Sequence, residues 1–440
     1  MAIITVVGAS GTTVQVTVDG GLNQKMAIDY QNSILKASAS SSLASFDLKP
    51  GSNSDTLSGS FSVVQGIVTA GGLYDVSGPY TNLVVGALTS DSSVLDGQVT
   101  VDASGSTGSS LSILTSNLGN TDITVGNQSG KYVATAGTST FDSSKSDGSW
   151  TISTGMDTKN TINLGSGSNY VVSEGQDTID GVGMNDTVTL LGGSSTVTLA
   201  THAAVVDAAS SDMITVGDAS TVFGGFGSTV NFSGSEGTVV GSIGDTITAA
   251  SSLLVVHGVS NDISASGALT FICGTGTTTI SAGTATIFGA AGLDALVNTT
   301  SSAALFVAND GNETIDGSSA SMGLHVFAGV GNDTVIGGSA SDTLVGGTGN
   351  ATLTGGSGAA NLFAITDGFA GGDYTITDFG SASGNIMALY GYGLQNSSGL
   401  QNVLDAATIA GGNTTIQLAD NSKITFVGVT DLTASNFNLS

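Results

Sequence analysis

The chain has 440 residues, of which 66 are glycine, 2 are proline and 40% are hydrophobic. Its 34 acidic residues outnumber 7 basic ones, all of them lysine, so the formal net charge is −27. Because nucleic-acid binding relies on Lys and Arg contacts to phosphates, this balance excludes a nucleic-acid surface. The hydrophobic content argues against disorder and favours many short strands between Gly, Ser, Asn and Asp turns. No run of 18 apolar residues is present, so we expect no membrane span.

Residues 1–50 predict a strand hairpin followed by a helix. Residues 1–20 alternate apolar and polar side chains, which is typical of two strands. Leu22, Met26, Tyr30 and Ile34 then form an i, i+4 stripe, which indicates an amphipathic helix. We interpret this segment as a cap over the open end of a repeat array, with docking to a neighbouring subunit or to a cell surface as the alternative.

Residues 51–305 predict a degenerate β-solenoid. A trio of Asn or Asp, usually Thr, and an aliphatic residue recurs there, for example at 177–179 and 186–188. The spacing between trios is irregular, so coil boundaries cannot be assigned from the sequence. Asp177 and Asp186 lie nine residues apart among turn glycines, and we predict an additional metal site around them. We interpret the single tryptophan, Trp150, as a loop anchor or subunit contact, with stacking on a sugar as the alternative.

Residues 306–365 carry the most specific pattern in the chain. Four nine-residue units stand end to end, and they read AGVGNDTVI (328–336), GGSASDTLV (337–345), GGTGNATLT (346–354) and GGSGAANLF (355–363). They match the pattern G-G-x-G-x-D-x-U-x, in which U is a large apolar residue, of a calcium-binding parallel β-roll. The apolar position of each unit is predicted to point inward, and the four residues are Val335, Leu344, Leu353 and Leu362.

Three acidic residues are the principal candidate ligands of this segment. Asp333 and Asp342 fill the sixth position of the first two units, whereas alanine fills it in the last two. Glu313 lies about one coil before Asp333, and His325 lies about one coil before Asp342. Carboxylates and turn carbonyls are the hard oxygen ligands that Ca²⁺ prefers. Glycines let the turns approach an ion closely, and those predicted to do so are Gly329, Gly331, Gly338, Gly347 and Gly349. The alternative is a metal-free solenoid whose Asp residues cap turns.

These units resemble the RTX (repeats-in-toxin) family of secreted calcium-binding proteins. Residues 366–440, with ITDF, DAAT and a tail containing Leu432, Phe437 and Leu439, resemble the segment that ends many members of that family. The resemblance implies a calcium cofactor, export from a Gram-negative cell by type I secretion machinery, and a secreted or cell-surface location. It also implies that 366–440 is both a cap and a secretion signal.

The expected fold is therefore all-β: an elongated parallel β-solenoid with a calcium-binding RTX β-roll, a short N-terminal helix cap and a C-terminal β-rich cap. The sequence contains neither H-E-x-x-H nor G-x-S-x-G, so we predict that the chain is not an enzyme. We expect a structural protein that assembles with itself into a surface layer, extracellular filament or biofilm matrix, with cell-surface polysaccharide as a further partner. The alternatives are a monomeric adhesin that binds carbohydrate or a surface, a polysaccharide-active β-helix enzyme, and an ice-binding protein suggested by its T-x-T segments.

Overall fold

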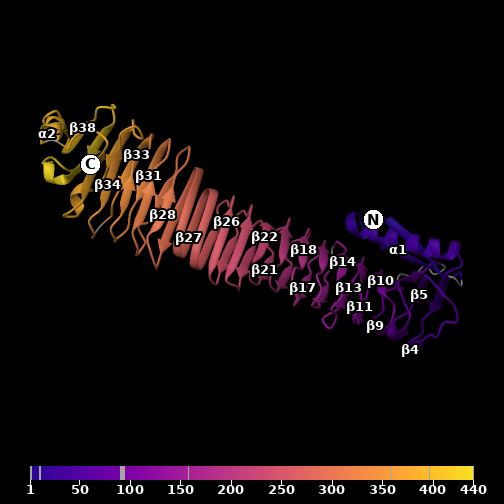
Figure 1. Cartoon of the computed structure of the whole chain (residues 1–440). Helices are drawn as coiled ribbons and strands as arrows, with labels where there is room; N and C mark the ends of the chain where they lie inside the picture. The colour runs from indigo at the N-terminus through magenta and orange to yellow at the C-terminus, as the bar shows by residue number, and fades with distance from the viewer. Residues whose placement is uncertain are drawn as a thin grey trace. The chain divides into compact units, whose positions relative to one another are not determined.

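The computed structural model describes residues 2–8, 11–89, 95–156, 158–356, 358–395 and 397–439. The chain is mostly β and forms a parallel β-solenoid of about 17 turns with two short helices, which confirms the predicted all-β solenoid. It divides into two compact units, Met1–Gly234 and Ser235–Ser440. Figure 1 shows the strands of the chain coloured by residue number. Among the helices described there, none is long and apolar enough to cross a membrane.

Each coil contributes two strands, and each strand pairs in parallel with its counterpart in the next coil. Two strand ladders result, which we call ladder A and ladder B. In unit 1, ladder A consists of β3 (Leu43–Asp47), β5 (Val63–Val68), β7 (Asn82–Val85), β10 (Ser110–Thr115), β12 (Ser129–Ala134), β14 (Trp150–Thr154), β16 (Tyr170–Ser173), β18 (Thr187–Leu190), β20 (Ala204–Asp207) and β22 (Ser220–Gly224). Ladder B consists of β4 (Gly51–Ser54), β6 (Gly72–Gly78), β9 (Val99–Ser106), β11 (Asn120–Val125), β13 (Thr138–Asp142), β15 (Thr161–Leu164), β17 (Thr178–Gly181), β19 (Thr196–Leu199), β21 (Met213–Val216) and β23 (Thr229–Phe232).

Unit 2 has the same construction. The long segment β27 (Asp262–Thr299) belongs to both ladders, because its residues 269–272 and 286–288 pair in ladder A and its residues 262–265 and 294–296 pair in ladder B. The other strands of ladder A are β24 (Glu236–Val240), β26 (Ser252–Val256), β28 (Ala304–Val307), β30 (Leu324–Phe327), β32 (Thr343–Val345), β34 (Leu362–Thr366), β36 (Ile386–Tyr390) and β40 (Phe437–Leu439). Those of ladder B are β25 (Thr246–Ala249), β29 (Thr314–Asp316), β31 (Asn332–Ile336), β33 (Asn350–Thr354), β35 (Asp373–Ile376) and β39 (Lys423–Phe426).

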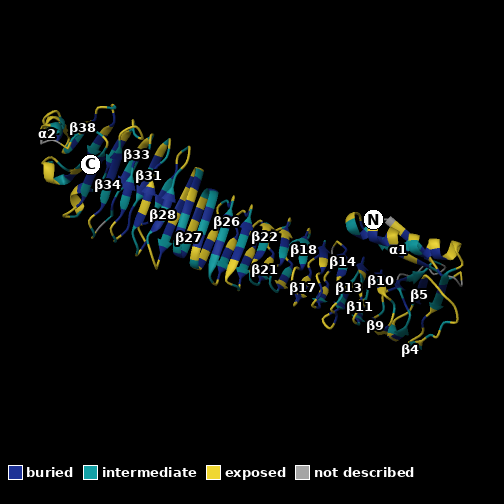
Figure 2. Cartoon of the chain, in the orientation of Figure 1, coloured by how far each residue is buried: buried dark blue, intermediate teal, exposed yellow. Residues whose placement is uncertain are grey.

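Strand alternation builds the interior of each unit. Because successive side chains of a strand point to opposite faces, one residue in two enters the coil and the next faces out. In ladder B, Ile162, Ile179, Val197 and Ile214 stack in register and are buried, and Figure 2 shows the same alternation along both ladders. The predicted inward residues follow this rule except in the fourth repeat unit. There Phe363, not Leu362, continues the stack below Leu344 and is fully buried.

Trp150 is an interior residue, so the prediction of a loop anchor or sugar-stacking side chain was wrong. It begins strand β14 and is 1% exposed. Its ring lies edge-on to Phe141 with centroids 4.9 Å apart, and Phe141 stacks on Tyr132 at 4.6 Å. Three aromatic rings therefore pack together in the interior of two successive coils. The Asp, Ser and Gly that precede Trp150 in the sequence belong to the turn before it.

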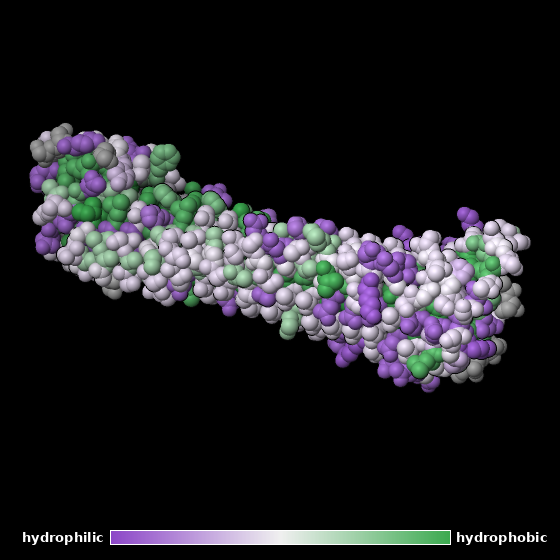
Figure 3. Space-filling view, turned by 60° about the horizontal axis from the view of Figure 1, so that its bottom comes forward, coloured by the Kyte–Doolittle hydropathy of each residue, from purple (hydrophilic) through white to green (hydrophobic). Residues whose placement is uncertain are grey.

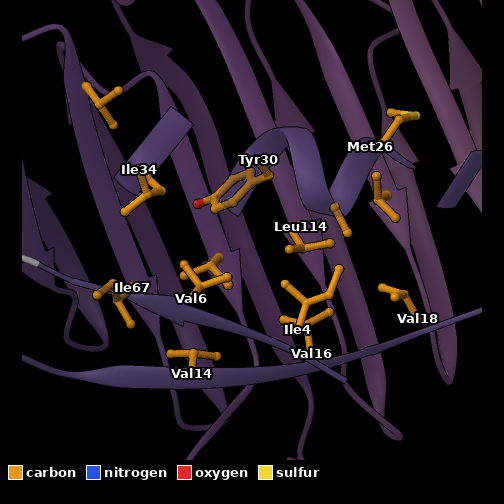
Figure 4. Packing of buried hydrophobic residues seen from close by; sticks show 14 of the residues in the cluster. Ile4, Val6, Val14, Val16, Val18, Met26, Tyr30, Ile34, Ile67 and Leu114 are labelled. Atoms are coloured by element: carbon orange, nitrogen blue, oxygen red, sulfur yellow. The ribbon is translucent and has the colours of Figure 1, made fainter. Parts of the chain in front are cut away.

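The N-terminal segment lies along the outer face of ladder A in unit 1. Strands β1 (Ala2–Val7), β2 (Thr13–Val18) and β8 (Ala87–Leu88) form a small antiparallel sheet, and helix α1 (Gly21–Ala39) contacts β5, β10, β12 and β14. The predicted stripe faces the ladder, because Met26, Tyr30 and Ile34 are buried and Leu22 is partly buried against the same cluster (Figure 4). The helix thus covers the side of successive coils, and not the open end over which the sequence pattern had placed it.

The last coils carry a β-rich cap, as predicted. Strands β37 (Thr408–Ala410), β38 (Asn413–Gln417) and β39 form an antiparallel meander, and β39 also pairs in parallel with β35. Helix α2 (Ser397–Asp405) precedes the meander, and the 3-10 turns η1 (Phe379–Ser381) and η2 (Ala434–Asn436) flank it in sequence. Packing among Phe363, Phe379, Phe426 and Phe437 fills the space beneath it.

Candidate metal centre

A column of polar side chains runs inside the turns that lead from ladder A to ladder B. In unit 1 its members in successive coils are Asn160, Asp177, Ser195, Asp212 and Ser228. Each member after Asn160 accepts a hydrogen bond from the backbone N–H of the member one coil earlier. The donor–acceptor distances, in order along the column, are 2.8, 3.2, 2.6 and 3.2 Å. Buried backbone donors require partners, so the first role of this position is to join one coil to the next.

Asp177 and Asp186 do not come together, although the sequence analysis assigned them to one additional metal site. Asp177 lies in a turn from ladder A to ladder B, whereas Asp186 lies in a turn from ladder B to ladder A. The Asp177 carboxylate already accepts four hydrogen bonds, from the backbone and side-chain amides of Asn160 and from the hydroxyls of Thr154 and Ser173. Asp186 Oδ1 accepts two from Asn169, and its Oδ2 has no partner.

The two repeat aspartates, Asp333 and Asp342, also lie in opposite turns. Asp333 accepts the backbone N–H of Glu313 at 3.1 Å and that of Gly329 at 2.9 Å. Asp342 accepts those of Leu324 at 2.6 Å and Gly338 at 3.1 Å. Burial raises the pKa of Asp342 above its ordinary value. Each carboxylate therefore joins coils through one oxygen, as Asp177 does, and its other oxygen accepts a hydrogen bond from a glycine four residues earlier in the same turn.

The predicted glycines are needed because successive turns stack in direct contact. A Cβ at Gly329 would overlap the carbonyl oxygen of Asn309, and one at Gly347 would overlap that of Ala328, in each case in the preceding coil. Gly349 meets the backbone of Gly331 in the same way, and Gly338 would press on carbonyls of Gly317 and Ala320. Gly331 also has a φ of +132°, a conformation that side chains disfavour. Close stacking brings many carbonyl oxygens to the turns.

Glu313 differs from the turn aspartates described above. It pairs in register with Asp333 of the next coil and is 1% exposed, yet neither carboxylate oxygen has a hydrogen-bond partner. Burial and the adjacent Asp333 carboxylate raise the pKa of Glu313 to about 7. An unpaired carboxylate in a buried position is costly unless a proton or a cation neutralises it.

His325 is not part of this arrangement. Its strand register places Leu324, not His325, one coil before Asp342, and the His325 side chain points out of the coil and is exposed. It follows that imidazole is not an available ligand at the Asp342 turn.

The sequence analysis missed a second pair of neighbouring carboxylates, formed by Asp207 and Asp212 in unit 1. Both are at least 97% buried, and Asp212 Oδ2 has no hydrogen-bond partner. Burial and the Asp207 carboxylate raise the pKa of Asp212 to about 7. The sequence does place two acids five residues apart across one turn, which could have indicated the pair. The turn between them, however, lacks the glycines that mark the repeat units.

The donor set fits an oxygen-coordinated divalent cation in composition. Among the described residues no group of three or more His, Cys, Asp and Glu gathers in one place. An ion at the Glu313–Asp333 turn would therefore be held by these two carboxylates together with backbone carbonyls or water, a mixture that calcium accepts readily. No protein-family model matches the chain, and no curated protein shows detectable similarity to it.

Proposed function

We propose that this chain is a secreted, calcium-dependent structural protein that assembles with copies of itself into a surface layer, extracellular filament or biofilm matrix. The observation that carries the proposal is the buried, unpaired Glu313 carboxylate beside Asp333, in a chain with a net charge of −27. Glu313 and Asp333 would hold the ion. Calcium supplies the positive charge that neighbouring side chains do not, and it takes carbonyl oxygens as ligands without strict octahedral geometry.

Calcium binding of this kind is coupled to folding. The two carboxylates meet only when successive coils have stacked, so the ion binds the folded turns and not the unfolded chain. Such a chain would stay loosely folded where calcium is scarce and would fold where calcium is abundant. This behaviour suits export by type I machinery, with 366–440 as the secretion signal. This route follows from the RTX resemblance.

Self-assembly is supported by the strand edges that the first coil leaves open. Strands β3 and β4 each pair on one side only, with β5 and β6, among the described residues. Unpaired strand edges readily accept strands of another molecule. Contacts between the end of one solenoid and a different surface of the next copy generate open filaments or lattices when the rotation does not close.

Electron microscopy of the purified full chain tests this function. We expect extended filaments or sheets in calcium at millimolar concentration, and dispersed particles in chelator or in magnesium alone. Dispersed monomers under all of these conditions would refute self-assembly and favour a monomeric adhesin that binds carbohydrate or a surface. Identical assemblies in calcium and in chelator would refute the calcium dependence.

A further inference from the structure

The outer face of ladder A in unit 2 carries two aligned stretches of apolar side chains. Strand register aligns Val240 with Val256 and Ile272, and separately aligns Phe288, Val307, Phe327 and Val345. Every one of these seven side chains is partly or largely exposed, and Phe288 and Phe327 are 41% and 46% exposed. We call these seven residues the outer apolar row. In Figure 3 apolar surface gathers over the C-terminal coils.

Apart from Glu236 at the start of β24, the face that contains this row carries no acidic side chain among the strand positions aligned with the row. The parallel outer row of ladder A consists of Thr238, Leu254, Thr270, Thr286, Leu305, His325 and Thr343. By contrast, the outward positions of ladder B in the same unit include Asp262, Asp294 and Asp316. In a chain with 34 acids, the outer face of ladder A in unit 2 is thus poor in negative charge, with Glu236 at its first strand as the one acid among these aligned positions.

The equivalent row in unit 1 is covered by an added layer of apolar side chains. There Ile67, Val84, Leu114 and Val133 stand in register on the outer face of ladder A. All four are buried, because strands β1 and β2 and helix α1 pack on them in one cluster (Figure 4). The solenoid interior does not reach these side chains, so their burial depends on the added apolar layer. In unit 2 the described residues supply no such layer.

A groove adjoins the outer apolar row at its C-terminal end. It has a volume of about 420 Å³, and its apolar lining includes Phe327, Val330, Val345 and Phe369. Phe369 is 70% exposed and Val330 is 50% exposed. Contiguous apolar surface of this kind on a soluble protein marks an interaction site.

We propose that the outer apolar row of unit 2 is a docking face for the same face of a second copy of this chain. This inference rests on the proposed self-assembly and assigns a surface to it. Two copies with a charge of −27 repel one another, so close approach is least unfavourable through a face that is poor in carboxylates. An apolar face is also complementary to a second copy of itself, because a two-fold contact places identical patches against each other. Sheets pack in this way face to face, with side chains from both interdigitating.

The dimensions of the row suit such a contact. Adjacent strands are about 4.8 Å apart, so seven coils extend about 30 Å. A patch about 30 Å long is the length expected for an interface that buries about 800 Å² on each partner, which is the size typical of specific complexes. Phe288 lies in the middle of the row, where apolar anchors contribute most to binding.

Sedimentation velocity of the full chain in calcium tests the proposal. The test variant combines Phe288→Asp with Phe327→Asp, and the matched control is Leu296→Asp, which alters an exposed apolar residue of strand β27 on ladder B. We expect the double variant to associate about a hundredfold or more weakly, because each contact would bury an unpaired carboxylate. The control is expected to associate like the wild type.

A second double variant, Phe288→Thr with Phe327→Thr, guards against misfolding. Threonine already occupies neighbouring outward positions, so this variant retains strand-forming residues, and circular dichroism checks that its melt matches the wild type. Weakened association of this variant supports the docking face. If both double variants associate like the wild type, the docking face is wrong while self-assembly through other surfaces stands. A wild-type chain that is monomeric in calcium overturns the docking face together with the proposed function.

Discussion

Asp177 in unit 1 and Glu313 in unit 2 occupy the same place in their coils, the last turn residue before a strand of ladder B, and their surroundings differ sharply. Asp177 follows Asn160, whose backbone and side-chain amides both donate to it. Glu313 follows Leu293 in register, and a leucine side chain has no donor to offer. The carboxylate of Asp177 is therefore saturated by the protein, whereas that of Glu313 has no hydrogen-bond partner.

This difference separates two roles for one sequence pattern. Asp177 joins coils through hydrogen bonds alone, whereas Glu313, which accepts none, remains available to a cation. Which role an acid takes depends on the residue one coil earlier, about 17 to 20 positions away in the sequence. The unit 1 position is thus predicted to matter for folding alone, and the unit 2 position to matter through calcium.

The largest expected effect comes from Asp177→Ala. This change removes four hydrogen bonds and leaves buried amide and hydroxyl groups without partners, so we expect a loss of about 3 kcal/mol in the free energy of unfolding. The loss should be the same in calcium and in chelator, because no ion is involved. Chemical denaturation under both conditions measures it.

Two comparisons sharpen the Asp177 result. Asp177→Asn keeps the shape and most of the hydrogen bonds and should cost much less, whereas Asp180→Ala, at an exposed position of the same strand, should cost almost nothing. A loss in Asp177→Ala that appears only when calcium is present would show that this aspartate is a metal ligand, and the division between the two roles would fail.

The recurring trio made the architecture predictable. In Asp177-Thr178-Ile179 and Asp333-Thr334-Val335 the acid lies at the turn, the threonine faces out and the aliphatic residue enters the coil. The α1 stripe was predictable for a similar reason, because helical periodicity is local. Coil boundaries were not, since coils vary in length and the register is set by stacking between residues far apart in sequence.

The candidate site was only partly predictable for the same physical reason. The nine-residue spacing identified Asp333 and Asp342, but their hydrogen bonds to backbone amides of the preceding coil depend on register. The prediction that Asp177 and Asp186 share a metal site was wrong, because a step of nine residues leads from one ladder to the other and places the two residues in opposite turns. The orphaned state of Glu313 depends on Leu293, and nothing in the local sequence signals it.

A smaller effect, with opposite signs in two conditions, is expected for Glu313→Gln. In chelator the amide removes an unpaired buried charge, so stability should rise by about 1 kcal/mol. In calcium the same change removes a ligand, so the stabilisation that calcium gives should shrink. Thermal melts at pH 7.5 with a calcium titration measure both.

Asp294→Asn is the matched control for Glu313→Gln, since it neutralises an exposed acid one coil earlier in the same ladder. It should leave the calcium response unchanged. If Glu313→Gln instead lowers stability in chelator and keeps the full calcium response, then Glu313 is a structural residue like Asp177, and the proposed ion must bind elsewhere.

The smallest effect is expected for Asp212 and depends on pH. Asp212 is intermediate between Asp177 and Glu313, because its Oδ1 accepts a hydrogen bond from the backbone N–H of Ser195 while its Oδ2 has no hydrogen-bond partner. Its folded pKa is about 7 against an ordinary 3.8, so the folded state holds a proton that the unfolded state releases. Stability in chelator should therefore be greatest below about pH 4 and fall as the pH rises to about 7. Asp212→Asn should flatten this decline, raising the melting temperature at pH 7.5 by about 2–4 °C, the shift that corresponds to roughly 1 kcal/mol in a domain of this size.

The exposed Asp180→Asn serves as the control and should leave the decline of stability with pH unchanged. A melting profile of Asp212→Asn that falls with pH as steeply as the wild type would show that the Asp207–Asp212 pair is not protonated, and that a half-satisfied carboxylate in this column behaves like the saturated Asp177.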